Sequence, residues 1–111
     1  MKGENMPTEG LYVEKSSGRV WVDGHLRPER LSKKEVKFIL HLAACREKIS
    51  SRQESVKAVF GTKYERADDQ RLDAMVGRIR RKIGDTTRPP RFLFTFHARG
   101  HCLSGYIGPR N

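Results

Sequence analysis

The sequence has no long apolar segment. Nothing in its 111 residues approaches the roughly 18 consecutive apolar residues that a membrane helix needs. The opening residues, MKGENMPTEG, also lack the apolar core of a secretion signal. These absences argue against a membrane partner and lead us to expect a cytoplasmic protein.

Cysteine is scarce. The two cysteines, Cys45 and Cys102, stand far apart without any CxxC spacing. This pattern indicates neither a metal knuckle nor a redox pair. We expect both thiols to be reduced and mostly buried.

Recognisable catalytic motifs are also missing: there is no Ser-His-Asp pattern, P-loop or GxGxxG. His97, His101 and Cys102 lack a fourth ligand that would make a zinc site, and surface histidines of a hairpin are the alternative. Asp69 and Asp73, one helical turn apart, lack the further carboxylates or base of a magnesium-dependent nuclease, and a helix cap and an ion pair are the alternatives. We therefore expect no metal, no cofactor and no catalysis.

Basic residues, by contrast, are plentiful. The chain has 23 Lys and Arg against 13 Asp and Glu, a formal charge of +10. Nine of the basic residues lie between positions 70 and 111, where Asp73 and Asp85 are the two acids. Clustered arginine suits a polyanion, because each neutralised phosphate releases condensed counterions. The alternative is a basic surface that serves solubility alone.

The length fits one domain with one modest core. We expect a flexible leader over residues 1–10, a folded domain over 11–107 and a tail over 108–111. Within the domain, two runs rich in Val, Tyr and Trp (LYVEK and RVWV) are followed by Asp23-Gly24, a hairpin signal. A small antiparallel sheet is predicted before Pro28.

Two capping boxes then predict two helices. Ser32 with Glu35 begins the first, and Ser51 with Glu54 begins a second, shorter helix that Gly61 ends. In such a box the serine hydroxyl accepts from the amide three residues on, whose own carboxylate accepts from the serine amide. Apolar residues at helical spacing form the buried stripes, namely Val36, Ile39, Leu40 and Ala43 in the first helix and Val56, Val59 and Phe60 in the second.

A third helix is predicted after the polar segment GTKYERAD, with Asp68 or Asp69 as its cap and Gly84 at its end. Its buried stripe is Leu72, Val76, Ile79 and Ile83. After a loop, residues 91–96 alternate as a strand, Gly100 permits a turn and residues 101–107 return. Burial in a core is more typical of Trp21 and of the phenylalanines of this hairpin than a stacking platform for single strands.

Together these segments resemble the OmpR/PhoB-type winged-helix effector domain over about residues 11–107. The first helix of that family starts Leu-Thr-x-x-Glu, its second starts Ser-Arg-Glu and ends Trp-Gly, and its third reads Asp-x-x-Ile-x-x-Leu-Arg-x-Lys-Leu. The matching residues are Leu31, Ser32 and Glu35; Ser51 to Glu54 with Phe60 and Gly61; and Asp73, Val76, Ile79, Arg80, Lys82 and Ile83.

The resemblance implies an α+β winged helix-turn-helix: a small N-terminal antiparallel sheet, three helices and a C-terminal β-hairpin wing. It also implies a bacterial, nucleoid-associated transcription regulator that binds double-stranded DNA sequence-specifically, with the third helix in the major groove and the wing at the minor groove. Tandem dimers on direct repeats and a contact with RNA polymerase follow from the same resemblance, the latter through Lys63, Tyr64, Glu65 and Arg66. The sequence contains no counterpart of the family's receiver domain, which leaves a fragment and a free-standing effector both open.

The third helix is also the expected DNA-reading element on physical grounds, because the side opposite its apolar stripe must face solvent. We predict that Arg71 and Arg78 read bases and that Arg80, Arg81 and Lys82 anchor phosphates. Ala74 is suited to a thymine methyl group. The full predicted face is Gln70, Arg71, Ala74, Gly77, Arg78, Arg80, Arg81 and Lys82.

In the wing we predict contacts from Arg91, His97 and Arg99, with Arg99 entering a narrow minor groove. The family favours Arg, Gly and Tyr where this chain has His97, Ala98 and His101, so the wing departs from the family pattern. Gly77 stands where a polar residue is usual. Either the helix backbone approaches DNA closely there, or base readout has partly decayed.

Two other functions compete with DNA binding. The same arginine-rich face would suit an interaction module that docks an acidic protein, and the basic charge would also suit RNA binding or a nuclease. Steep loss of duplex binding with salt separates DNA binding from a protein-docking role.

Overall fold

The computed structural model describes residues 8–109. Its N-terminal part is a three-stranded antiparallel sheet in the order β1 (Leu11–Val13), β2 (Val20–Val22), β3 (His25–Leu26). The predicted Asp23-Gly24 turn joins β2 to β3, with both residues at positive φ, 52° and 81°. The predicted small sheet before Pro28 is thereby confirmed.

Both predicted capping boxes are present. They begin α1 (Lys33–Ala44) and α2 (Arg52–Phe60), with the serine hydroxyl and the glutamate carboxylate bonded reciprocally in each. Gly61 ends α2 in the left-handed region at φ 70°. The two capping boxes therefore predicted the starts of α1 and α2 correctly, and Gly61 predicted the end of α2.

The third helix, α3 (Asp68–Ile83), is buried through Leu72, Met75, Val76, Ile79 and Ile83 and ends at Gly84. The predicted aspartate cap is wrong. The chain is already helical at Ala67 (φ −60°, ψ −23°), which is the N-cap and has no side-chain cap bond. Asp68 accepts instead from the Glu65 amide at 2.8 Å, and Asp69 accepts from the Tyr64 hydroxyl at 2.7 Å. Both carboxylates still lie in the first turn, where the helix dipole favours them.

The C-terminal hairpin is shorter than predicted at both ends. Its strands are β4 (Leu93–Phe96) and β5 (Gly100–Leu103). Residues 91 and 92 lie outside it, and their amides donate to Asp85. Beyond β5 the chain leaves the hairpin: Tyr106 forms a bridge with Leu11, and the Ile107 amide donates to the Leu11 carbonyl at 2.8 Å. The end of the predicted returning strand therefore extends the N-terminal sheet.

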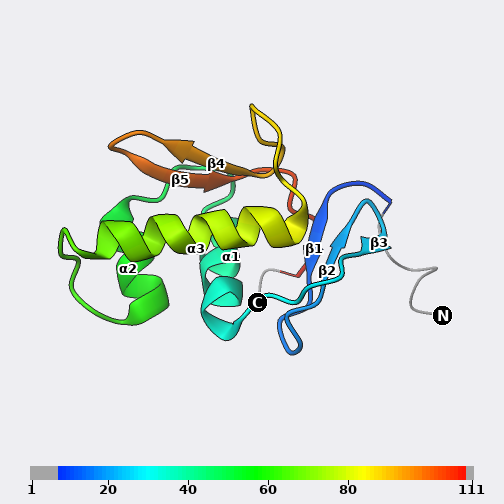
Figure 1. Ribbon diagram of the computed structural model, residues 1–111, viewed down its shortest axis with the longest axis horizontal. Helices are drawn as coiled ribbons and strands as arrows, with labels where there is room; N and C mark the ends of the chain where they lie inside the picture. Colours follow the sequence, from blue (N-terminus) through cyan, green and yellow to red (C-terminus); the bar gives the residue numbers. More distant parts are fainter. Residues whose placement is uncertain (1–7, 110–111) are drawn as a thin grey trace.

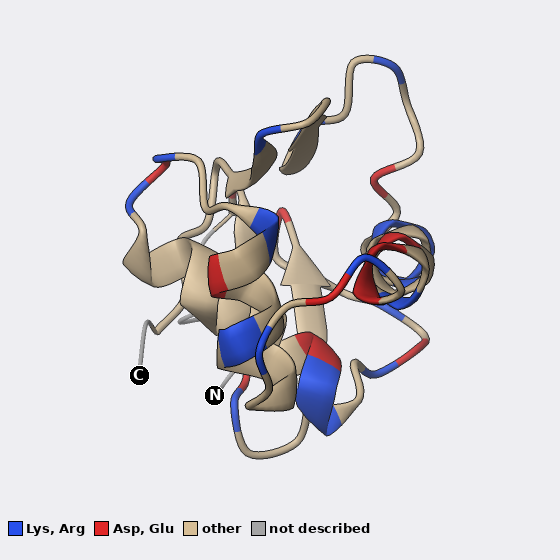
Figure 2. Cartoon of the chain, turned by 90° about the vertical axis from the view of Figure 1, so that its left-hand side faces the viewer, with Lys and Arg blue, Asp and Glu red and all other residues tan. Residues whose placement is uncertain are grey.

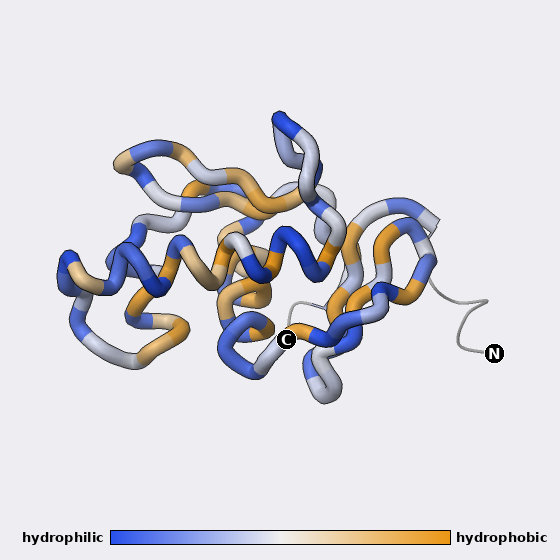
Figure 3. The backbone as a smooth tube through the Cα atoms, viewed as in Figure 1, coloured by the Kyte–Doolittle hydropathy of each residue, from blue (hydrophilic) through white to orange (hydrophobic). Residues whose placement is uncertain are grey.

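Figure 1 shows α3 lying across the front of the molecule, with the hairpin above it, α1 and α2 below and behind, and the N-terminal sheet at its C-terminal end. Apolar positions concentrate on the strands and on the helix sides that face one another (Figure 3). The largest fully buried side chains include Phe38, Leu42, Leu72, Ile79 and Leu93. Within residues 8–109, no helix has the length and apolar content to cross a bilayer.

Gly100 is required by close packing as well as by its φ of 135°. A Cβ at this position would lie 1.9 Å from the Ser50 carbonyl oxygen. The close approach exists because β5 also pairs with Ser50 on its other side, through bonds of 2.8 and 3.0 Å between the Ser50 and His101 backbones. This pairing fixes the hairpin to the start of α2.

The ends of the predicted domain fall partly outside the described residues. Of the predicted leader, residues 1–7 are not described, whereas Gly10 is buried and its amide donates to Asp23 at 2.9 Å. Of the predicted tail, residues 110 and 111 are not described, and the Pro109 carbonyl accepts from the Tyr106 hydroxyl. Gly10 and Pro109 thus both bond to residues of the folded domain.

Candidate nucleic-acid interface

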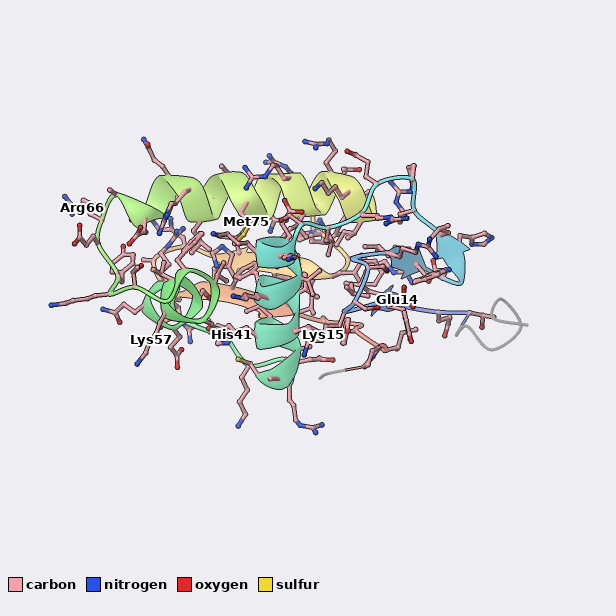
Figure 4. The ribbon with its side chains drawn as sticks, turned by 90° about the horizontal axis from the view of Figure 1, so that it is seen from below. Glu14, Lys15, His41, Lys57, Arg66 and Met75 are labelled. Atoms are coloured by element: carbon pink, nitrogen blue, oxygen red, sulfur yellow. The ribbon has the colours of Figure 1, made fainter. Side chains whose placement is uncertain are left out.

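The predicted DNA-reading side of α3 is open. Gln70, Ala74, Gly77, Arg78 and Arg81 are all exposed, and neither the hairpin nor α1 covers them. Figure 4, seen from below, shows Met75 on the side of α3 that faces α1, while other side chains project from the opposite side. The geometric condition for a helix that enters a DNA groove is therefore met.

Small side chains occupy the middle of this open side, and basic ones surround it. Ala74 and Gly77 form the centre, and the Arg81 side chain beside them is 60% exposed with a long 3.8 Å contact to Glu29. Figure 2 looks nearly along α3 and shows the helix at the edge of the molecule, with Lys and Arg positions around it and acidic positions at the end nearer the viewer. A helix with this profile can approach a polyanion without steric obstruction.

Arg78 and Lys82 lie on the flank of α3 that faces α1. Arg78 Nε is 3.2 Å from Glu35 Oε2, and Lys82 Nζ is 2.8 Å from Glu35 Oε1. Arg78 remains 50% exposed, but Lys82 is only 15% exposed. Arg78 is thus still half-exposed to solvent, whereas Lys82 mainly neutralises a buried carboxylate.

Arg80 lies on the opposite flank and holds the hairpin. Its Nε and Nη2 donate to the Leu93 carbonyl at 3.0 and 2.7 Å, and Nη2 also donates to Thr95 Oγ1 at 3.0 Å. Burial lowers the pKa of Arg80. Its first task is therefore to fix the wing relative to α3, which the sequence pattern did not reveal.

Arg71 is also engaged within the protein. Its guanidinium lies 3.7 Å from the centroid of the Phe60 ring, and its Nε is 3.0 Å from Asp68 Oδ1. The side chain remains 51% exposed. Stacking on Phe60 directs the Arg71 guanidinium toward α2.

A groove of about 620 Å³ separates α3 from the hairpin and the loop before it. It contains residues that the sequence reasoning missed: Arg88, exposed in the loop, and Thr86, Thr87 and Thr95. Arginine and threonine are typical donors to phosphate oxygens. The Thr-Thr-Arg run before Pro89 was the available signal, but only the fold brings it next to Arg80 and Arg81.

Two predicted placements in the wing are wrong. Arg91 precedes the hairpin, where its two terminal nitrogens each lie 2.6 Å from a carboxylate oxygen of Asp23. This contact with Arg91, helped by the Gly10 amide, lowers the pKa of Asp23 to about 2. His101 is fully buried and is not a surface histidine. His97 and Arg99 do lie exposed at the hairpin end, as predicted.

Cys102 is buried, Cys45 is half-buried, and both are free thiols whose pKa values are raised chiefly by burial. Cys102 and His101 are adjacent residues of β5, so their side chains point to opposite faces. Nowhere between residues 8 and 109 do three or more His, Cys, Asp or Glu side chains gather as metal ligands.

The predicted polymerase-contact loop joins α2 to α3. Lys63, Glu65 and Arg66 are exposed there, and Tyr64 is half-buried. Figure 4 shows Arg66 projecting outward from this loop. An open hollow of about 410 Å³ lies between the loop and α2, bordered by Lys57. The contact of this loop with RNA polymerase stays a prediction.

Three helices with an open third helix, a basic groove beside it and a hairpin wing define a winged-helix domain of the DNA-binding kind. The sequence matches the family model described as "Transcriptional regulatory protein, C terminal" over residues 27–103, and the chain belongs to that family. The resemblance drawn from the helix motifs and the predicted fold class are both confirmed.

Solved structures share this fold. The DNA-binding domain of RstA from Klebsiella pneumoniae, in complex with the RstA box, has a TM-score of 0.74 and 21% identity, covering 90% of this chain and 96% of that chain. The DNA-binding domain of CpxR from E. coli has a TM-score of 0.66 and 21% identity, covering 88% of this chain and 93% of that one. No curated protein sequence gives a significant match.

Gly77 offers a test of how closely α3 approaches its target. It is exposed, and a Cβ there would meet no atom within 4 Å. Gly77→Ala should therefore raise the free energy of unfolding by about 1 kcal/mol, since alanine loses less backbone entropy in a helix. Urea denaturation measures this, with Ala74→Gly as the matched control that should lower stability similarly.

The DNA affinity of the same variant separates the two explanations of Gly77. If the backbone approaches DNA closely, Gly77→Ala binds several times more weakly although it is more stable. Unchanged or tighter binding would favour the other explanation, in which base readout has partly decayed at the position where the family usually has a polar residue. A fall in stability would contradict the open space seen around Gly77.

Proposed function

We propose that this chain binds double-stranded DNA sequence-specifically and acts in bacterial transcription regulation in the cytoplasm, without catalysis. In this proposal α3 enters the major groove and the hairpin wing meets the adjacent minor groove. The observation that carries it is the open side of α3, which has small residues at its centre and Arg78 and Arg81 at its edges. Membership of a transcription-regulator family supports it.

The neighbouring structures support the same function. Two of them hold DNA: the RstA domain with the RstA box, and the AdeR domain with an intercistronic region. AdeR has a TM-score of 0.61 and 18% identity, covering 86% of this chain and 94% of that chain. We infer that this chain presents its third helix to DNA in a comparable way.

Roles are assigned to individual side chains from their exposure and their printed hydrogen bonds. Arg78 is the base reader, because its side chain is 50% exposed, its bond to Glu35 uses Nε, and a guanidinium can bond guanine O6 and N7 together. Arg81 and Arg88 contact phosphates on either side of the groove beside α3. Arg99 enters the minor groove from the hairpin end. Gln70 and Ala74 contact bases at the N-terminal half of α3.

The test uses duplexes selected by the wild-type chain from a random-sequence library, compared with a scrambled duplex of equal length. Arg78→Ala should weaken the selected duplex by about 1–3 kcal/mol and leave the scrambled duplex nearly unchanged. Arg81→Ala should weaken both and reduce the salt slope by about one. Fluorescence anisotropy across a salt series measures both effects.

Lys48→Ala is the matched control, because Lys48 is exposed beyond the C-terminal end of α1, away from the open side of α3. It should change neither affinity appreciably. Absence of duplex binding at low salt would overturn the proposal and favour an interaction module for an acidic protein. Equal losses on selected and scrambled DNA from Arg78→Ala would remove its base-reading role.

A further inference from the structure

Glu35 is a buried carboxylate where the first turn of α1 meets the C-terminal half of α3. It occupies the first turn of α1, where the capping box explains its presence, yet its side chain is only 3% exposed. The equivalent residue of the second capping box, Glu54, is exposed. A helix cap works at the surface, so capping alone does not account for the burial of Glu35.

The two carboxylate oxygens of Glu35 accept hydrogen bonds from different donors. Oε1 accepts from the Ser32 amide at 2.9 Å and from Lys82 Nζ at 2.8 Å, and Oε2 accepts from Arg78 Nε at 3.2 Å. Burial alone would raise the pKa of Glu35, but these hydrogen bonds outweigh it and hold the pKa below its ordinary value. The carboxylate is therefore ionised at neutral pH and holds both cations.

The contact to Arg78 engages one particular nitrogen. Bonding at Nε leaves Nη1 and Nη2 of Arg78, the two nitrogens that form the fork for guanine. An exposed arginine otherwise loses considerable rotamer freedom when it binds. Held at Nε by a fixed carboxylate, the guanidinium has its orientation largely set before DNA arrives.

We propose that Glu35 is a positioning residue for DNA readout: from α1 it holds Arg78 by Nε and so directs the Arg78 fork outward from α3. Lys82 balances the remaining charge of the same carboxylate and is not a phosphate anchor. This inference rests on the proposed function, because it assigns a role to Arg78 in base readout. It adds that specificity depends on a residue of α1 that does not itself reach DNA.

The test compares Glu35→Gln with wild type on the selected and scrambled duplexes. Glutamine keeps an oxygen for the Ser32 amide, so the capping box survives. We expect discrimination between the two duplexes to fall about tenfold, mainly through weaker binding of the selected duplex. Glu54→Gln is the matched control, since it makes the same change in the exposed box of α2, and should leave discrimination unchanged.

Two further measurements separate positioning from a purely structural role. In the free protein, the Nε–H resonance of Arg78 should shift and exchange faster in Glu35→Gln, whereas Lys82→Met should preserve both this resonance and the discrimination. In a double-mutant cycle, Glu35→Gln should have little further effect on discrimination once Arg78 is alanine. Thermal denaturation shows whether each variant remains folded under the assay conditions.

The outcomes distinguish this inference from the proposed function. If the wild-type chain enriches no sequence, the proposed function fails, and this inference fails with it. If it enriches a sequence and Glu35→Gln discriminates as well as wild type, the inference alone fails. Additive effects of Glu35→Gln and Arg78→Ala on discrimination would also overturn it, because Glu35 would then act independently of Arg78.

Discussion

Replacing Asp85 with alanine is expected to lower the free energy of unfolding by about 3 kcal/mol or more. Asp85 follows the glycine that ends α3 and is only 3% exposed. Its Oδ1 accepts from the Arg91 amide at 2.6 Å, and its Oδ2 accepts from the amides of Phe92 and Leu93 at 3.0 and 2.8 Å. Alanine would leave all three backbone donors without this partner, two of them in fully buried hydrogen bonds.

Urea denaturation followed by circular dichroism measures the effect. Asp85→Asn should fall between wild type and alanine, because the amide keeps one acceptor oxygen but places an NH₂ group against backbone donors. Glu65→Ala, in the exposed loop before α3, is the control for losing one carboxylate and should stay within about 0.5 kcal/mol of wild type. Equal midpoints for Asp85→Ala and Glu65→Ala would contradict the structural role of Asp85.

The elements that the sequence predicted correctly are those with complete local signals. In each capping box, both partners of the hydrogen bonds lie within four residues of one another in the sequence: Ser32 with Glu35, and Ser51 with Glu54. Gly84 ends α3 because only the local backbone conformation decides that stop. The predicted start of the third helix was wrong because the local signal there was incomplete. Asp68 has the right chemistry for a cap, but the preceding loop was already helical by Ala67.

The sequence predicted which side of α3 is open, but not which residues of the protein its side chains contact. Helical period separates the buried side of α3 from the open side, and that division was correct. It does not tell which neighbour approaches each flank, so the attachment of Arg80 to the hairpin and of Lys82 to Glu35 could not be foreseen. Arg91 shows the same limit, since its partner Asp23 is 68 positions away in the sequence.

The burial of His101, like the ion pair of Arg91, could not be foreseen from the sequence. We expect this buried histidine to make the stability of the fold sensitive to acid. The ring is fully buried, 5.7 Å from the centroid of Phe38, and within residues 8–109 neither ring nitrogen has a hydrogen-bond partner. Burial lowers the pKa of His101 to about 4, with repulsion from Arg52 and Arg80 adding to it against the attraction of Asp73. The folded protein therefore keeps this ring neutral.

The stability of the fold should decrease as the pH is lowered from 6.5 toward 4. The His101 ring takes up a proton near its ordinary pKa of 6.5 in the unfolded chain, but only near 4 in the folded chain. Below pH 6.5 the unfolded state binds more protons, so acid favours unfolding. His101 alone should contribute a loss of about 2–3 kcal/mol by pH 4.5, with little further loss below pH 4.

Comparison of wild type with His101→Phe isolates this contribution from other groups that titrate nearby. Burial also lowers the pKa of His41, so His41 acts in the same direction, but its share is common to both proteins. Phenylalanine retains the edge contact with Phe38 and removes the two unpaired ring nitrogens. The stability difference in favour of His101→Phe, measured by urea denaturation, should therefore widen steadily from pH 7 to pH 4.5. Parallel stability curves for the two proteins would show that His101 does not resist protonation in the folded state.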